Sequence, residues 1–196
     1  ALLAIAGLLA LVKPGFLSLP NLILVARQIS INGILAVGAT YVLLTGGVDL
    51  SLGSVVALAG VVAAGFAHPD AHALWVPIAM GVLMGTLCGA TNGVVVTWGR
   101  VAPFIVTLGM MTVARGLALV LSGGKPVSNL QREFTTIGSG DLLGIPIPVW
   151  ILAAVASCSA LLLRWARLGR YLYAVGGNER AAHAAGIRVN AVKTFA

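Results

Sequence analysis

The sequence predicts an all-α protein that crosses a membrane several times, a polytopic transmembrane helical bundle. The prediction depends on composition and on the lengths of the apolar stretches. Of 196 residues, 59% are hydrophobic and 9% are charged, and the mean hydropathy is +1.04, whereas a soluble domain has about a quarter charged residues. Five acidic residues cannot give so much apolar sequence a wettable surface, which excludes a soluble protein and a disordered chain.

Six apolar stretches are the expected spans, and several reach the roughly 20 residues that a helix needs to cross a bilayer. They are residues 1–12, 22–46, 52–67, 74–98, 103–121 and 145–163. No internal repeat or low-complexity tract divides them, so we expect one transmembrane domain over residues 1–196. We also expect both ends to be truncated, because the sequence starts without methionine and turns apolar again at 191–196.

The formal net charge of +7 lies mainly between the apolar stretches, where it indicates membrane topology rather than a nucleic-acid partner. Six basic residues and one acidic residue lie between Arg164 and Lys193. We therefore expect the loop at 164–190 to be cytoplasmic. Counting spans backwards gives external loops at 67–73 and 122–144 and a cytoplasmic turn at Gly99-Arg100, with Lys13 as the one basic residue on the unexpected side.

Four glycines spaced by four lie on one side of the 74–98 span, at Gly81, Gly85, Gly89 and Gly93. Such a stripe lets another backbone approach closely. We predict a helix-packing ridge, and the alternative is a ridge that lines a solute path.

A second glycine-containing feature follows the 22–46 span, in the run from Thr45 to Gly53. Gly46 and Gly47 allow the helix to break there, and Asp49 or Ser51 is expected to cap the helix that follows. A broken helix at membrane depth needs protein or water beside it.

Few polar side chains lie within the spans, and we place Asp49, Asn92 and Arg115 near a solute path. Arg115 lies about two turns from the external end of its span, where an arginine is costly unless it reaches the interface or meets a partner. A structural arginine and one that faces an aqueous path fit equally well. For Asn92 the alternative is a hydrogen bond between helices.

The sequence lacks the signatures of an enzyme or of a metal site. No Gly-x-x-x-x-Gly-Lys-Ser/Thr run occurs, so the chain has no phosphate cradle with which to hydrolyse ATP alone. The serines have no intramembrane histidine to activate them. His68, Asp70 and His72 are interpreted as a solvated turn rather than a metal site, because no further ligand clusters with them.

The most informative short element runs from Gly176 to Ile187. Asn178 is a good N-cap, Glu179 complements the positive end of a helix, and Gly186 supplies a left-handed stop. These residues predict a helix of about two turns. Its alanines are expected to present a small surface with no apolar face to bury, so it needs something to dock into. A helix lying on lipid headgroups and a partner-binding knob both fit.

Three long blocks follow one another in the chain: Thr45–Ser54, then Asn92-Gly93 leading to Val101–Gly116, and finally Gly169–Glu179. In this order they resemble the membrane-spanning permease subunit of bacterial ATP-binding-cassette sugar importers, in the branch that includes the ribose, xylose, arabinose and galactose systems. The resemblance covers essentially the whole chain. It implies that residues 1–196 form a single permease domain and that the full-length subunit has more spans.

The resemblance implies that the helix from Asn178 to Gly186 is a coupling helix, which inserts into a cleft of a cytoplasmic ATPase. The residues implied in this coupling are Asn178, Glu179, Arg180, Ala181, Ala182, Gly186 and Ile187. Importers commonly have a glutamate directly ahead of the two alanines, where this chain has Arg180. Glu179 lies one residue earlier, which rotates its side chain by about 100°. The docking role is expected to survive, while the salt bridge from the usual glutamate is in question.

The resemblance also implies a function without bond chemistry, the import of a monosaccharide, a ribose-like pentose or a hexose, across the bacterial inner membrane by alternating access. The implied partners are a cytoplasmic ATP-binding subunit, a periplasmic sugar-binding protein, a second permease copy or a paralogue, and membrane lipid. ATP and Mg would bind to the ATPase, and this chain would bind no cofactor. The alternative is an ion-coupled secondary transporter of a small polar solute, in which Asp49 is the only carboxylate near membrane depth.

Overall fold

The computed structural model describes residues 2–13, 15–69 and 71–196, and these residues are mostly helical. In chain order the elements are α1 (Leu2–Val12), α2 (Leu19–Leu44), α3 (Leu52–Phe66), α4 (Trp75–Thr97), α5 (Pro103–Ser122), α6 (Arg132–Ser139), β1 (Asp141–Leu142), β2 (Ile145–Pro146), α7 (Ile147–Trp165), α8 (Arg167–Gly177), α9 (Glu179–Ala184) and α10 (Val189–Phe195). The predicted all-α class is confirmed, and the two-residue strands, which pair antiparallel in a small hairpin, are an addition to it.

Each of the six predicted spans contains an apolar helix, but the helices differ in length. In the described part of the chain, four helices are long and apolar enough to cross a membrane, namely α2, α4, α5 and α7 with 26, 23, 20 and 19 residues. The other two, α1 and α3, have 11 and 15 residues, which at about 1.5 Å per residue fall short of a hydrocarbon core of about 30 Å. Of the six predicted spans, four therefore contain a helix long enough to cross a membrane in the described residues, and two contain a shorter apolar helix.

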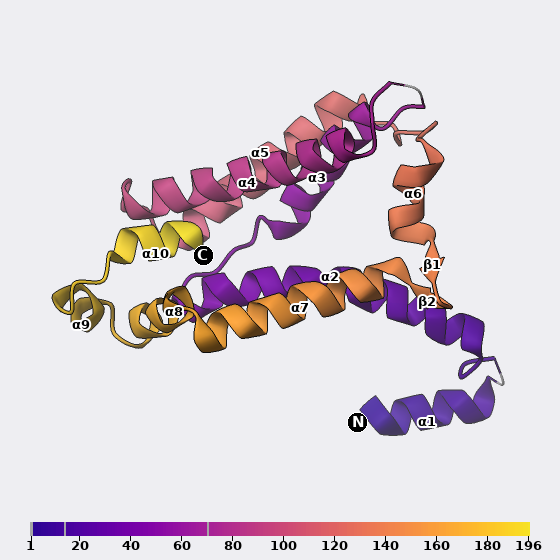
Figure 1. Ribbon diagram of the computed structural model, residues 1–196, viewed down its shortest axis with the longest axis horizontal. Helices are drawn as coiled ribbons and strands as arrows, with labels where there is room; N and C mark the ends of the chain where they lie inside the picture. The colour runs from indigo at the N-terminus through magenta and orange to yellow at the C-terminus, as the bar shows by residue number, and fades with distance from the viewer. Residues whose placement is uncertain (1, 14, 70) are drawn as a thin grey trace.

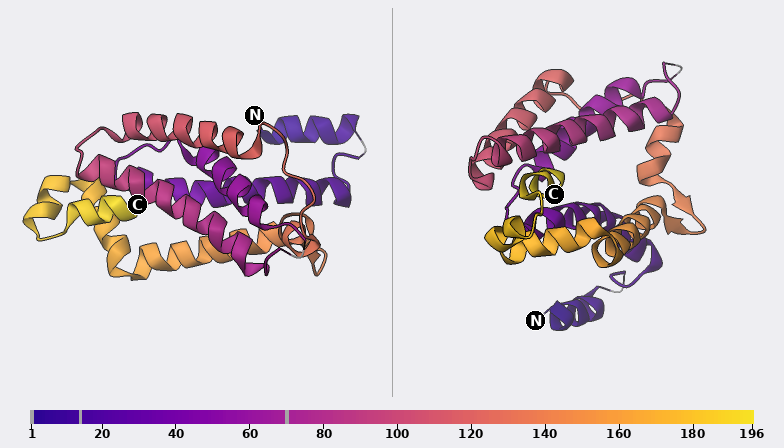
Figure 2. Two further views of the ribbon diagram at one scale, coloured as in Figure 1. Left: turned by 90° about the horizontal axis from the view of Figure 1, so that it is seen from above. Right: turned by 60° about the vertical axis from the view of Figure 1, so that its left-hand side comes forward.

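The membrane helices form two layers (Figures 1 and 2). In one layer α3, α4 and α5 share a buried core of Leu58, Cys88, Ala114 and Ala118. In the other layer α2 and α7 lie side by side. Here Gly33 permits a close approach, because a Cβ at this position would lie 3.0 Å from both methyl carbons of Leu152.

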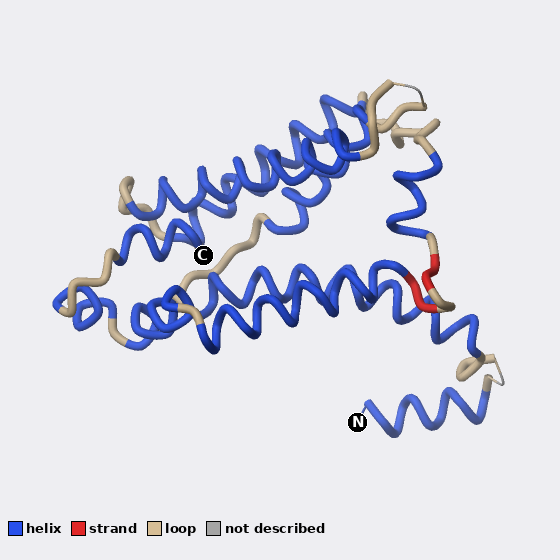
Figure 3. Tube along the Cα trace, viewed as in Figure 1, coloured by secondary structure: helices blue, strands red, loops and turns tan. Residues whose placement is uncertain are grey.

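The two layers are joined at both ends of the molecule. At one end α8, α9 and α10 lie between them, and we call this the basic end because six basic residues lie between Arg164 and Lys193. At the opposite end α6 and the β1–β2 hairpin connect the two layers. Between these ends the segment 45–51 leaves α2 and crosses to α3 without helical structure, as Figure 3 shows.

The loops that were predicted to share a side of the membrane do lie together. At the opposite end, the backbone N–H of Gln131 donates to the carbonyl of Ala67 at 2.8 Å, and His68 Nδ1 lies 3.1 Å from the carbonyl oxygen of Asn129. At the basic end, Arg100 lines one cleft together with Arg188. The pairing of loops is confirmed, and the cytoplasmic assignment of the basic end still depends on its charge.

Candidate functional site

A cleft of about 800 Å³ lies between the two layers, next to the basic end. Its walls come from the end of α2 and the segment that follows, from one face of α4, from the first turns of α5, and from the ends of α8 and α10. Asp49 and Asn92, two of the predicted path residues, both line it, as do Gly89 and Gly93 of the predicted ridge. The cleft therefore brings together sequence features that lie far apart in the chain.

The break after α2 is confirmed, and its geometry explains why helix cannot continue. Gly46 adopts a φ of +77°, a left-handed conformation that glycine takes without strain. The N–H of Gly47 then turns back to the carbonyl of Val42 at 3.1 Å. The chain leaves the helix axis at this point and forms one wall of the cleft.

The predicted cap of the next helix is wrong. Ser51 occupies the N-cap position of α3, but its side chain makes no capping hydrogen bond. Instead Asp49 Oδ1 accepts from the Ser51 N–H at 2.7 Å and from its hydroxyl at 2.6 Å. This is a local turn in which an aspartate bonds the backbone two residues on, so Asp49 Oδ1 bonds Ser51 itself and not the first turn of α3.

Asn92 ties the broken segment to α4. Its Nδ2 donates to Ser51 Oγ at 3.1 Å, and Asn92 and Ser51 are only 7% and 1% exposed. Thr107 of α5 adds a second tie by donating to the carbonyl of Val48 at 3.3 Å. Asn92 Oδ1 is buried and has no hydrogen-bond partner among the described residues. Asn92 thus makes the helix-connecting hydrogen bond that was one of its two predicted roles, and it lines the cleft as well.

The glycine ridge of α4 divides into packed and open positions. A Cβ on Gly81 would lie 3.2 Å from Ala63 Cβ on α3, and a Cβ on Gly93 would lie 2.8 Å from Thr194 Cα on α10. A Cβ on Gly85 or Gly89 would meet nothing within 4 Å in the described structure. The ridge is thus in close contact with other helices at its two ends, while Gly89 faces the cleft, and the role of the whole ridge in helix packing stays a prediction.

Arg115 does not join Asp49 and Asn92. It is exposed on α5 and is absent from the lining of the cleft. Its neighbour Ala114 is fully buried on the face of α5 that packs against α3, and successive helical side chains diverge by about 100°. The structure therefore places Arg115 away from this core, and its suggested role near a path stays a prediction.

The short helix at the basic end is capped as predicted. Asn178 Oδ1 accepts from the Ala181 N–H at 3.0 Å, and α9 follows directly from Glu179 to Ala184. Gly186 ends the helix with a φ of +83°, and the next residue, Ile187, donates its N–H to the carbonyl of Ala182 at 3.1 Å. The local signals of the sequence are sufficient to specify this helix.

The expectation that α9 has no apolar face to bury is wrong. Ala182 is 4% exposed and packs in a core with Leu172, Val175, Val189 and Val192. Sequence reasoning missed this core, although Leu172 and Val175 on α8, and Val189 and Val192 on α10, have the i, i+3 spacing of one helix face. All other residues of α9 remain exposed, namely Glu179, Arg180, Ala181, His183 and Ala184.

No group of three or more histidine, cysteine or acidic side chains that could hold a metal ion is found within residues 2–13, 15–69 and 71–196. Of the three residues considered in the 67–73 loop, Asp70 lies outside the described residues. His68 faces the Asn129 carbonyl and His72 packs edge-on against Phe66.

Comparison with known proteins gives a consistent result. Residues 21–196 match the family described as the permease component of branched-chain amino acid transport systems. The chain is 41% identical to the ribose import permease protein RbsC of Haemophilus influenzae, over 100% of the chain and 61% of the relative. It is 43% identical to RbsC of Escherichia coli, over 98% and 61%, and 39% identical to RbsC of Bacillus subtilis, over 96% and 59%. The chain spans about three fifths of the length of these relatives, and no solved structure matches it.

Proposed function

Because this chain belongs to the family of transport-system permease components that it matches over residues 21–196, we propose that it is the membrane subunit of an ATP-driven sugar importer. The solute is a monosaccharide, a ribose-like pentose or a hexose, and the membrane is the bacterial inner membrane. The observation that supports this function most is the position of α9, an exposed capped helix at the basic end that belongs to the same group of helices as one wall of the cleft.

In this proposal α9 docks into a cleft of a cytoplasmic ATP-binding subunit. Its exposed residues Arg180, Ala181, His183 and Ala184 supply the docking face. Glu179, which is exposed as well, pairs with Lys193 of α10. Asn178 caps the start of the helix and Gly186 ends it, while Ala182 packs its opposite face into the core with α8 and α10. ATP and Mg bind to the ATPase, and this chain changes conformation without catalysing a reaction.

The cleft is the proposed part of the solute path that this chain contributes. Its polar lining includes the neutral side chains of Thr86, Asn92 and Thr107, which donate and accept hydrogen bonds, as sugar hydroxyls do. The charged residues of the lining already have partners in the chain, since Asp49 bonds Ser51 and Glu179 pairs with Lys193. The unpartnered Asn92 Oδ1 offers a further acceptor when the walls separate. A periplasmic sugar-binding protein delivers the solute at the opposite end, and a second permease copy or a paralogue completes the path within the lipid bilayer.

The ion-coupled alternative has no support from the family or from the relatives. Asp49, the carboxylate nearest to membrane depth, already accepts two hydrogen bonds from Ser51. Both bonds end on Oδ1, so an ion that bound to this oxygen would have to compete with them.

The test is a pull-down, in detergent, of the full-length protein with the ATPase encoded beside it. Ala184→Trp places a large side chain on the docking face of α9, and Ala73→Trp, at an exposed position in the 67–73 loop of the opposite end, is the matched control. We expect the Ala184 variant to lower ATPase retention by about tenfold or more, with no loss in the control. Ala182→Trp is unsuitable, because Ala182 is buried in the core and the variant would disturb the fold. Equal retention by both variants would refute the docking role.

Transport itself is tested in proteoliposomes that contain the permease, the ATPase and the binding protein. The proposal expects ribose uptake that requires ATP. Uptake driven by an ion gradient without the ATPase would establish the alternative instead.

A further inference from the structure

The three helices α8, α9 and α10 hold one another as a single unit, which we call the α8–α10 unit. Its core consists of Leu172, Val175, Ala182, Val189 and Val192, each 6% exposed or less. An ion pair adds a direct link between two of the helices, since Lys193 Nζ on α10 lies 2.6 Å from Glu179 Oε2 on α9. Displacing α9 alone would therefore break both apolar and polar contacts.

The unit rests on α2 at a position that only glycine permits. A Cβ on Gly176 of α8 would overlap the carbonyl oxygen of Leu44, so the two backbones touch with no side chain between them. Leu44 is the last residue of α2, directly before the broken segment that forms one wall of the cleft.

The unit rests on α4 at a second glycine. A Cβ on Gly93 would lie 2.8 Å from Thr194 Cα and 2.9 Å from its carbonyl oxygen. The Thr194 hydroxyl lies 3.1 Å from Thr97 Oγ1 and donates to the Gly93 carbonyl at 3.4 Å. Gly93 follows Asn92, the residue that holds the broken segment, so this contact lies on the facing wall of the cleft.

We propose that the α8–α10 unit is a clamp that sets the width of the cleft, and that Lys193 is the positioning residue through which movement of α9 reaches α4. The inference rests on the proposed function, because it takes the movement of α9 to come from the docked ATPase. Lys193 pairs with the first residue of α9 and directly precedes Thr194, the residue seated on Gly93. A displacement of α9 is thus passed to the α4 wall within two consecutive residues.

Because the ion pair is exposed, a role in positioning α10 can be distinguished from a role in stabilising the fold. The side chains of Lys193 and Glu179 are 25% and 55% exposed, and pairs this accessible to water add little to folding stability. Loss of the pair should therefore leave the protein folded and able to bind the ATPase. What it should change is how far the movement of α9 is transmitted.

The first test measures the solute transported per ATP hydrolysed and the amount of ATPase retained. Lys193→Met is compared with Lys125→Met, which removes a lysine from an exposed loop at the opposite end. We expect transport per ATP to fall by about fivefold in the Lys193 variant, with ATPase retention unchanged. Lys193→Arg, which keeps the positive charge opposite Glu179, should stay within about twofold of the wild type. A Lys193→Met variant with the same transport per ATP as the Lys125 control, or a Lys193→Arg variant no better than Lys193→Met, would overturn the proposal.

The second test needs no ATPase and so separates the clamp from the proposed function. Spin labels at the exposed positions Leu43 on α2 and Leu87 on α4, in a protein whose native cysteines are replaced by alanine, report the distance between the walls. Gly93→Ala should shift the mean distance by about 1 Å, because its new Cβ would otherwise stand closer to Thr194 than carbon atoms pack. Gly85→Ala, whose Cβ meets nothing within 4 Å, should not. No shift in the Gly93 variant overturns the clamp, whereas a shift in a protein that never binds an ATPase refutes only the proposed function.

Discussion

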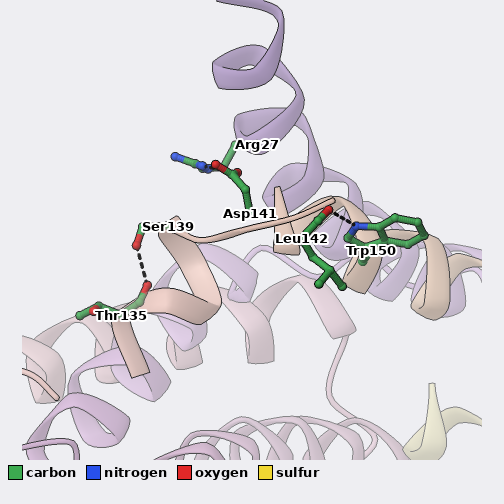
Figure 4. Close-up of polar contacts among 6 residues, drawn as sticks. All are labelled: Arg27, Thr135, Ser139, Asp141, Leu142 and Trp150. Carbon is green, nitrogen blue, oxygen red and sulfur yellow. Dashed lines mark hydrogen bonds and ion pairs between the residues drawn. The ribbon is translucent and has the colours of Figure 1, made fainter. Parts of the chain in front are cut away.

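The two connections between the helical layers depend on different kinds of contact. At the basic end the α8–α10 unit has its own buried apolar core and meets α2 and α4 backbone to backbone at glycines. At the opposite end α6 has no buried residue, and the connection is polar. Arg27 of α2 pairs with Asp141 of β1 at 3.0 Å, and Trp150 Nε1 of α7 donates to the Leu142 carbonyl at 3.3 Å (Figure 4).

This difference indicates how each end responds to force. Buried apolar contacts and backbone contacts resist sliding because every displacement opens space or causes overlap. Exposed polar contacts contribute little by themselves, and at the opposite end, unlike at the basic end, α6 adds no buried residue to them. We therefore expect the basic end to move as one body and the opposite end to yield, which is what the proposed function requires if the ATPase acts at the basic end and solute enters at the other.

The largest effect is expected from opening a cavity in the core of the α8–α10 unit. Leu172 is fully buried, whereas Leu143, at the tip of the β1–β2 hairpin, is 87% exposed. Leu172→Ala should lower the free energy of unfolding by about 3 kcal/mol, and Leu143→Ala should change it by less than about 0.5 kcal/mol. Thermal unfolding of the purified protein in detergent measures both. Equal losses would remove the contrast between the two ends.

A smaller effect is expected at the contact between α8 and α2. Gly176→Ala introduces a Cβ that overlaps the Leu44 carbonyl, while the neighbouring Gly177 has nothing within 4 Å of its Cβ position. We expect the Gly176 variant to lose about 2 kcal/mol, as overpacked sites do, and Gly177→Ala to be close to neutral. The same unfolding measurement applies, and a Gly176 variant as stable as its neighbour would show that the backbones are not in contact.

The smallest effect is expected from the ion pair of the opposite end. The side chains of Arg27 and Asp141 are 26% and 48% exposed, so Arg27→Met should cost only about 0.5 kcal/mol. Raising the salt concentration should bring the wild type toward the variant, because salt screens exposed pairs. Arg132→Met, at an exposed position on α6, serves as the control. A loss above about 2 kcal/mol at Arg27 would place this end in the same class as the basic end.

Local signals in the sequence were sufficient for the elements that depend on neighbouring residues. Composition predicted the membrane helices, Gly46 predicted the break after α2, and Asn178 with Gly186 predicted both ends of α9. Each of these features depends on residues within one short stretch of the chain, and the hydrogen bonds involved span five residues or fewer. The cap of α3 failed for the same kind of reason, since Asp49 found a nearer partner in Ser51.

Contacts between distant segments could not be predicted in this way. Nothing in the sequence around Gly176 identifies Leu44 as its neighbour, and Lys193 lies 14 residues from Glu179 in the chain. The separation of Arg115 from Asp49 and Asn92 likewise depends on how α5 turns against α3. The clamp consists almost entirely of such contacts, which is why it emerges only from the structure.

Hydrogen exchange of the reconstituted protein, with and without the docked ATPase, tests the central claim most directly. If the α8–α10 unit moves as one body, ATPase binding should slow exchange throughout residues 167–195, and should leave α6 and the β1–β2 hairpin unchanged. Protection confined to α9, or equal protection at both ends, would contradict the account.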